Sequence, residues 1–277
     1  MRIRKRTKVT IISYVLSFIL MLALMGISII ALGKYSMLSS HGVIHTCDRI
    51  SYYEGIRDEM KEQAYYIGIP FGIKKSEVKG VFNTQQIRKD MVDVFEAQMN
   101  GKTNQINTDK ISEKITYNVE KQIKRKISSE EKVSLQAYIS QVEDMYRKKM
   151  TIPGSEYIAK VSNLWTNVTT VGIPVCVLIV VLCIFFLISM RTYLHHGLRF
   201  VAYGVLGAGV TLLTVFSALI SNAFIYKFNI SDVYMRKFYT FLLGHEMLMQ
   251  VFAGIGFLLA GAIIIYVVYR QKSNIER

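Results

Sequence analysis

Four long apolar runs without a charged residue constrain this chain more than any other feature of its sequence. A helix needs about 20 consecutive apolar residues to cross the hydrocarbon core of a bilayer, and each run is long enough. Inside lipid the backbone must satisfy its own hydrogen bonds, so we expect each run to form a helix. The sequence therefore predicts an all-α membrane protein with four transmembrane helices. They cover residues 9–32, 168–190, 200–221 and 247–269.

The polar stretch of residues 33–167, between the first and second runs, also has a helical pattern. Its apolar residues recur every three or four positions, and two segments open with capping-box signals at Asn83 and Ser128. We expect about five amphipathic helices packed as a small bundle, the last leading directly into the second span. The predicted apolar faces include Ile87 and Met91, then Ile111, Ile115 and Val119, then Val133, Ala137, Val142, Tyr146 and Met150.

Basic residues near the ends of the spans predict the orientation of the chain. Residues 1–8, 191–199 and 270–277 are rich in Lys and Arg and fall on one side if there are four spans. Both termini are then cytoplasmic, while residues 33–167 and 222–246 are outside. Basic residues in the outer loop, at Lys227, Arg236 and Lys237, oppose this bias without reversing it. The fold class is thus four transmembrane helices with a helical extracellular domain inserted between the first and the second.

The first span has an alternative interpretation as a cleaved signal peptide. A basic start, an apolar run and a small-residue segment at residues 31–34 are typical of such peptides. The apolar core of a signal peptide is about 7–15 residues long, which is shorter than this run. We therefore expect an uncleaved anchor.

The formal net charge of +14 does not predict a nucleic-acid partner. Residues 33–167 hold an excess of only four basic residues, and most of the remaining excess flanks the spans. The basic cluster at residues 121–126 is expected to be a solvated helix face, and contact with anionic lipid or a wall polymer is the alternative. The partner that the composition predicts directly is the lipid bilayer.

Three cysteines do not form a disulfide framework in this sequence. Cys176 and Cys183 lie inside the second span, and Cys47 is alone in the outer domain, where no other cysteine could pair with it. An exported, disulfide-free domain rich in Lys and Ile is typical of Gram-positive bacterial surfaces. We therefore expect a multi-pass protein of the plasma membrane of such a bacterium.

Two histidines and a cysteine lie close together just after the first span. His41 and His45 would share one face of a helix, and Cys47 follows them. His245 and Glu246 lie at the outer end of the fourth span and are the further candidates for ligands of one metal ion. Two ligands one helical turn apart, completed by groups from another span, permit a metal site.

The residues between these histidines favour a different interpretation. A zinc-protease helix has the pattern His-Glu-x-x-His, whereas Gly42, Val43 and Ile44 separate His41 from His45. Gly42 and the polar residues before it also disfavour a continuous helix. We therefore expect interfacial polar residues, no metal and no cofactor.

Other catalytic patterns are also missing from the sequence. It contains no Gly-x-Ser-x-Gly, no P-loop and no Asp, Glu, Lys, Arg or His in the middle of a span, which argues against an enzyme and against a transporter that works alone. Small residues four apart predict close helix packing, within the chain or in a homo-oligomer. These candidates are Gly204 with Ala208 and Gly256 with Ala260.

The layout resembles that of FtsX/MacB-type permease subunits in topology. That resemblance implies an inner N-terminus, a large outer domain after span one and three clustered spans, but the eight residues before the first span are short for a coupling helix. Our leading hypothesis is a non-enzymatic surface interaction or signalling module that binds a peptide, a wall component or another membrane protein. The alternatives are an accessory subunit of a transport complex driven by a separate ATPase, and an outer-face metal-dependent enzyme.

Overall fold

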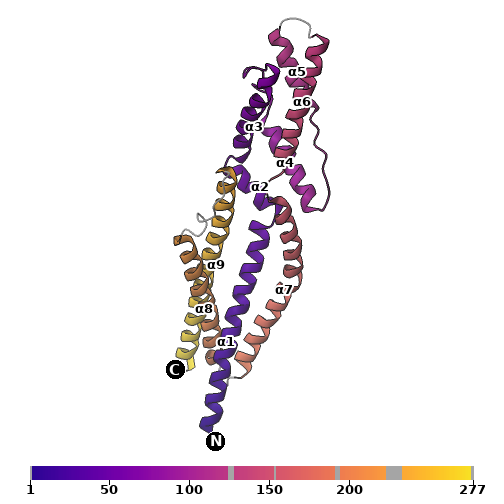
Figure 1. The fold of residues 1–277 in the computed structure, drawn as a ribbon. Coiled ribbons are helices and arrows are strands. Elements are labelled where there is room, and N and C mark those ends of the chain that lie inside the picture. The colour runs from indigo at the N-terminus through magenta and orange to yellow at the C-terminus, as the bar shows by residue number, and fades with distance from the viewer. Residues whose placement is uncertain (1, 124–127, 153, 191–193, 223–232, 276–277) are drawn as a thin grey trace. The chain divides into compact units, whose positions relative to one another are not determined.

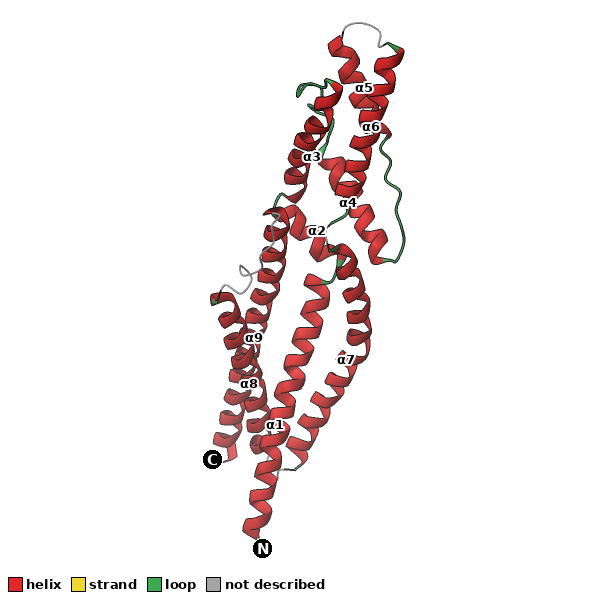
Figure 2. Ribbon diagram, viewed as in Figure 1, coloured by secondary structure: helices red, strands yellow, loops and turns green. Residues whose placement is uncertain are grey.

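The computed structural model describes residues 2–123, 128–152, 154–190, 194–222 and 233–275. Within these ranges the chain consists of helices and loops, and no strand occurs (Figure 2). The all-helical prediction is therefore confirmed for this part of the chain. Figure 1 labels the helices in chain order. They are α1 (Arg2–Leu32), α2 (Ser40–Arg49), α3 (Tyr52–Gly68), α4 (Thr84–Met99), α5 (Asp109–Ile123), α6 (Ser129–Lys149), α7 (Ser155–Ser189), α8 (Leu194–Ser221) and α9 (Val233–Ile275), with two short turns, η1 (Gly33–Met37) and η2 (Ile69–Phe71).

Four of these helices are long and apolar enough to cross a membrane, which confirms the predicted number of spans. The candidate spans are Thr7–Ser36, Ser155–Ser189, Leu194–Ser221 and Val233–Ser273. As expected, the last helix of the polar stretch leads directly into the second span, because α7 is one continuous helix.

The chain divides into two compact units, which are described separately below. The first comprises Met1–Gly42, Ser162–Ser231 and Tyr239–Arg277. The second comprises Val43–Val161 together with Asp232–Phe238.

In the first unit α1 packs along α8. The hydroxyl of Ser17 donates a buried hydrogen bond of 2.8 Å to the carbonyl oxygen of Phe200 and so joins the two helices. Because lipid is as apolar as these side chains, close packing and hydrogen bonds hold such helices together. The core around this bond consists of Leu20, Cys183, Leu187, Phe200, Val201 and Val205.

A π-helical turn ends the first span. In η1 the N–H of Leu38 donates to the carbonyl oxygen of Gly33, five residues earlier, at 3.1 Å. Two contacts from α7 reach this end of α1. The hydroxyl of Ser162 donates to the carbonyl oxygen of Leu38 at 2.8 Å, and the indole N–H of Trp165 donates to that of Ile30 at 3.1 Å.

A new helix, α2, begins after a break of two residues rather than continuing η1. The hydroxyl of Ser39 accepts from the N–H of Gly42 at 3.0 Å, as a helix N-cap does. The predicted break in the helix is therefore present, but it precedes Gly42, which lies inside α2.

In the second unit one of the two predicted capping boxes forms completely. At the start of α6, Ser128 and Glu131 each bond the other's backbone N–H. At the start of α4 only half of the box forms, because Asn83 accepts from the N–H of Gln85 while the side chain of Gln86 bonds Asp90 instead. The prediction for Asn83 is thus correct about the cap and wrong about its reciprocal partner.

The predicted apolar face of α6 is wrong over its first half. Val133 is 70% exposed and Ala137 is exposed, whereas Leu135 and Tyr138 are buried. Both sets have helical spacing, but the larger pair removes more apolar area from water, and the helix turns accordingly. The faces predicted for α4 and α5 are confirmed, and their buried residues include Ile87, Met91, Ile111, Ile115 and Val119.

Some features of the sequence fall outside the described residues. They are Lys124, Arg125 and Lys126 of the basic cluster, Arg191 of the loop between the second and third spans, and Lys227 of the loop before α9.

Candidate functional site

The structure places both candidate histidines and Cys47 on α2. His41 and His45 are exposed and one turn apart, while Cys47 has no exposed surface. Burial raises the pKa of the Cys47 thiol to about 12.

Asp48, the next residue along α2, pairs with an arginine from α4. Nε and Nη2 of Arg88 donate to its two carboxylate oxygens at 2.7 and 2.9 Å. This bidentate hydrogen bonding lowers the pKa of Asp48 below its ordinary value, and the guanidinium also lies 6.0 Å from the centroid of the Tyr53 ring. The contact joins α2 to α4, so both oxygens of Asp48 have a structural partner.

Glu246 belongs to a polar cluster between α1 and α9 in the first unit. One carboxylate oxygen accepts from the hydroxyl of Ser36 in η1, and the other accepts from the amide of Gln250 at 3.0 Å. The side-chain oxygen of Gln250 in turn accepts from the hydroxyl of Ser28 at 2.9 Å. Sequence reasoning missed Gln250, whose only signal is a lone amide inside an apolar run.

In the described part of the chain, no three His, Cys, Asp or Glu side chains gather closely enough to hold an ion. The expectation that His41, His45 and His245 are interfacial remains a prediction.

The predicted helix-packing residues fall into two different environments. A Cβ atom at Gly204 would lie 2.9 Å from the carbonyl oxygen of Ser17, and Ala208 is completely buried. Gly256 and Ala260 are exposed, and a Cβ atom at Gly256 would meet no atom within 4 Å.

The close approach on α9 occurs at a different glycine. A Cβ atom at Gly254 would lie 3.0 Å from the carbonyl oxygen of Gly209, so these two glycines place the backbones of α8 and α9 in direct contact. The spacing of small residues in the sequence does not show that Gly209 and Gly254, rather than Gly256, make this contact.

One surface feature of the second unit is a polar groove between α4 and α5. It consists of two adjoining cavities of about 300 and 220 Å³, which share Gln86 and Lys110. The larger cavity is also lined by Lys89, Asp90, Asp93, Asn104, Gln105, Ile106 and Asn107, and the smaller one by Val81, Phe82, Asn83, Ile111, Lys114 and Tyr146.

Asp90 and Tyr146 are hydrogen-bonded to each other in the lining of this groove. The phenol of Tyr146 donates to one oxygen of Asp90 at 2.6 Å, and the amide of Gln86 donates to the other at 2.7 Å. The Tyr146 ring stacks on Phe82 with a centroid separation of 6.3 Å. Burial, together with the hydrogen bond to Asp90, raises the pKa of Tyr146 above its ordinary value. The phenol is therefore a neutral donor that holds Asp90 in place.

The connection between α4 and α5 forms one wall of the groove and appears as a long loop in Figure 2. At its start Gly101 has a φ of +67°, and the N–H of Lys102 donates to the carbonyl oxygen of Ala97 at 2.8 Å. This left-handed glycine and the backward hydrogen bond form a Schellman motif, which ends α4 sharply.

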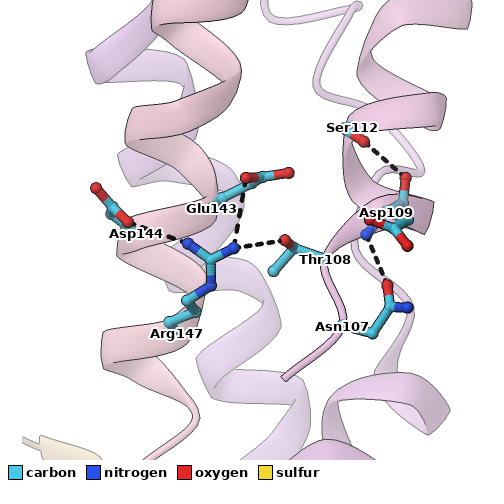
Figure 3. A network of polar contacts seen from close by, with 7 residues as sticks. All are labelled: Asn107, Thr108, Asp109, Ser112, Glu143, Asp144 and Arg147. Carbon is cyan, nitrogen blue, oxygen red and sulfur yellow. Dashed lines mark hydrogen bonds and ion pairs between the residues drawn. The ribbon is translucent and has the colours of Figure 1, made fainter. Parts of the chain in front are cut away.

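A polar network holds the other end of the same wall (Figure 3). The guanidinium of Arg147 on α6 donates to the hydroxyl of Thr108 at 3.0 Å and to Asp144 at 3.2 Å, and it lies 3.6 Å from Glu143. Thr108 is buried, and the side chain of Asn107 accepts from the N–H of Asp109 at 2.8 Å. Both ends of the wall are therefore tied to helices.

The lining of the groove combines several kinds of polar and aromatic side chain. It offers amides, lysines, aspartates and aromatic rings, and among the described residues that line it there is no histidine, cysteine or serine. Sequence reasoning missed this groove because its residues come from α4, α5, α6 and a loop, and no local motif marks them.

Fold and groove together define a class: an all-helical protein with four helices of membrane-spanning length and a helical unit that carries a polar groove. Comparison of the chain with protein-family models, with curated proteins and with solved structures finds no match.

Proposed function

We propose that this protein is a non-enzymatic interaction module of the plasma membrane that binds another membrane or cell-surface protein. The observation that carries the proposal is the two-part groove between α4 and α5, whose wall is fixed at both ends and whose lining offers hydrogen bonds and charges. Convergent polar groups on a concave surface fix the orientation of a ligand.

The same proposal places the helical domain of residues 33–167 outside the cell. Lys and Arg concentrate beside the spans on the opposite side, in residues 1–8, 191–199 and 270–277, and this bias sets topology. Four helices of spanning length then anchor the module. In that arrangement the groove is accessible to partners at the cell surface.

Site-specific photocrosslinking in intact cells tests the proposal. A photoreactive amino acid at Gln105, in the groove wall, is expected to form a discrete adduct with one partner protein. The matched control is Val133, which is 70% exposed on α6 but does not line the groove. Equal crosslinking from both positions, or none from Gln105, would reject the groove as the binding site.

The identity of the adduct also decides between the two non-enzymatic hypotheses. A single-pass or secreted protein captured through the groove supports an interaction module. Capture of an ATPase-associated permease subunit would support the alternative, an accessory subunit of a transport complex.

A further inference from the structure

We propose that the groove between α4 and α5 binds an extended acidic peptide segment of the partner protein. This inference rests on the proposed function and adds the chemistry of the ligand.

The charges of the lining favour an anionic ligand. Lys89 lies on α4, while Lys110 and Lys114 lie one turn apart on α5, so both helices present cations to the groove. Of the two aspartates, Asp90 already accepts a hydrogen bond at each oxygen, from Gln86 and from Tyr146. These bonds leave Asp90 charged, so the whole lining has three lysines against two aspartates. The positive charge is concentrated in the smaller cavity, which is lined by Lys110 and Lys114 and, among the described residues, by no carboxylate, and this charge favours a ligand with carboxylates.

The amides of the lining favour a peptide over other anions. Five side chains carry this group, which holds both N–H donors and a C=O acceptor. The oxygens of Asn83 and Asn107 already accept from backbone N–H groups and the Gln86 amide donates to Asp90, so Asn104 and Gln105 are the amides that offer both groups to a ligand. An extended peptide backbone presents the matching C=O and N–H groups along its length, whereas a phosphodiester polymer presents acceptors only and would leave amide oxygens without donors. The five are Asn83, Gln86, Asn104, Gln105 and Asn107.

The size and the apolar contacts of the groove also fit a short peptide segment. The two cavities share Gln86 and Lys110 in their linings, so they lie next to each other on the same surface. Ile106 lines the first, and Val81 with Ile111 lines the second, so apolar side chains alternating with acidic ones would also find contacts. Together the cavities are large enough for a few residues rather than for a folded surface.

Peptide binding to the full-length protein in phosphatidylcholine nanodiscs tests the inference. The probes are fluorescein-labelled octapeptides of alternating Glu and Ala, with Gln or Lys replacing Glu in two matched controls. We expect saturable binding of the Glu peptide, at least tenfold weaker binding of the Gln peptide, no binding of the Lys peptide and no displacement by inorganic polyphosphate at equal charge.

Variants locate the binding within the molecule. Lys110→Glu with Lys114→Glu should weaken binding of the Glu peptide at least tenfold, and both side chains are exposed, so the fold should persist in circular dichroism. Lys132→Glu is the control, because this exposed lysine lies on α6 outside the groove. Equal losses in the control, equal binding of the Gln peptide, or displacement by polyphosphate would overturn the acidic-peptide assignment.

The two proposals fail separately. If the Gln105 photocrosslink captures a partner but the peptide series shows no preference for Glu, the interaction module stands and the ligand chemistry is wrong. If the crosslink is also absent, both proposals are wrong.

Discussion

Gly42 on α2 touches the carbonyl of Ser36 so closely that a Cβ atom at position 42 would lie 1.7 Å from that oxygen. The new Cβ atom and the Ser36 oxygen could separate only if the backbone of η1 or α2 shifted, because both atoms are attached directly to the backbone of these helical segments. A glycine that sequence patterns treat as a helix breaker is thus the residue that lets α2 start where it does.

We therefore expect Gly42→Ala to lower the free energy of unfolding by about 2 kcal/mol or more. Thermal unfolding of the full-length protein in detergent, followed by circular dichroism, measures this. The control is Gly256→Ala, where the new methyl group meets no atom within 4 Å and stability should stay unchanged or rise by up to about 1 kcal/mol. Similar effects at the two positions would contradict the close contact at Gly42.

In the second unit, the same substitution should have very different effects on stability at the buried Ile115 and at the exposed Val133. Ile115 is 2% exposed, so Ile115→Asp would bury an unpaired charge and should cost about 3 kcal/mol or more. Val133 is 70% exposed, so Val133→Asp should change stability by less than about 0.5 kcal/mol. Chemical denaturation of both variants checks the contrast, and a large loss at Val133 would restore the face that the sequence pattern predicts.

The pair of Asp48 and Arg88 predicts a loss of stability in acid. The pKa of Asp48 is lower in the folded protein than its ordinary value of 3.8, so its contribution is present above that pH and is lost as the pH falls further. Both side chains are partly exposed, and the coupling energy should be only about 1 kcal/mol. A double-mutant cycle with Asp48→Asn and Arg88→Met at pH 7 measures it, and repeating the cycle at successively lower pH should show the coupling decline only below about pH 3.8. No coupling at pH 7 would argue against the ion pair.

Cys47 predicts the opposite dependence, a loss of stability in base. Its pKa rises from 9.0 to about 12 on folding, so its contribution is complete below pH 9 and disappears between pH 9 and 12. Cys47→Ala should therefore unfold with a shallower dependence on pH in that window. The native thiol should also resist maleimide at pH 7 until the protein is denatured, and rapid labelling of the folded protein would show that Cys47 is accessible.

The orientation of the spans has its own test, which uses a neighbour of Cys47. His45 is exposed on α2, so His45→Cys supplies a thiol that reagents can reach. A membrane-impermeant maleimide added to intact cells should label this variant and should not label a cysteine in place of Ser273. The reverse pattern would place residues 33–167 inside the cell.

Spans and helix starts could be predicted from the sequence because they depend on local chemistry. An apolar run of spanning length has few alternatives, and a cap such as Ser128 with Glu131 satisfies backbone groups within one turn. The rotation of α6 could not be predicted in the same way. Val133 and Leu135 both begin helical patterns, and only the neighbours that pack on α6 decide which one is buried.

The polar contacts within the first unit and the groove depend on residues far apart in the chain. Ser28 and Gln250 are 222 positions apart, and neither belongs to a motif. Likewise Asp90 and Tyr146 meet only because α4 and α6 fold against each other, 56 positions apart. Periodicity identifies which residues share a face of one helix, but it carries no information about the helix that this face meets.

Because of the π-helical turn at Gly33–Met37, the direction in which its side chains point depends on the exact number of residues in this segment. An α-helix advances about 100° per residue, and a π-turn accommodates one residue more than an α-turn. Removing a single residue from the segment would let it close as α-helix and would carry Ser36 about 100° around the axis, away from Glu246. Insertions and deletions should therefore be tolerated in the loop between α4 and α5 far better than at the end of α1, where the number of residues itself positions a hydrogen bond.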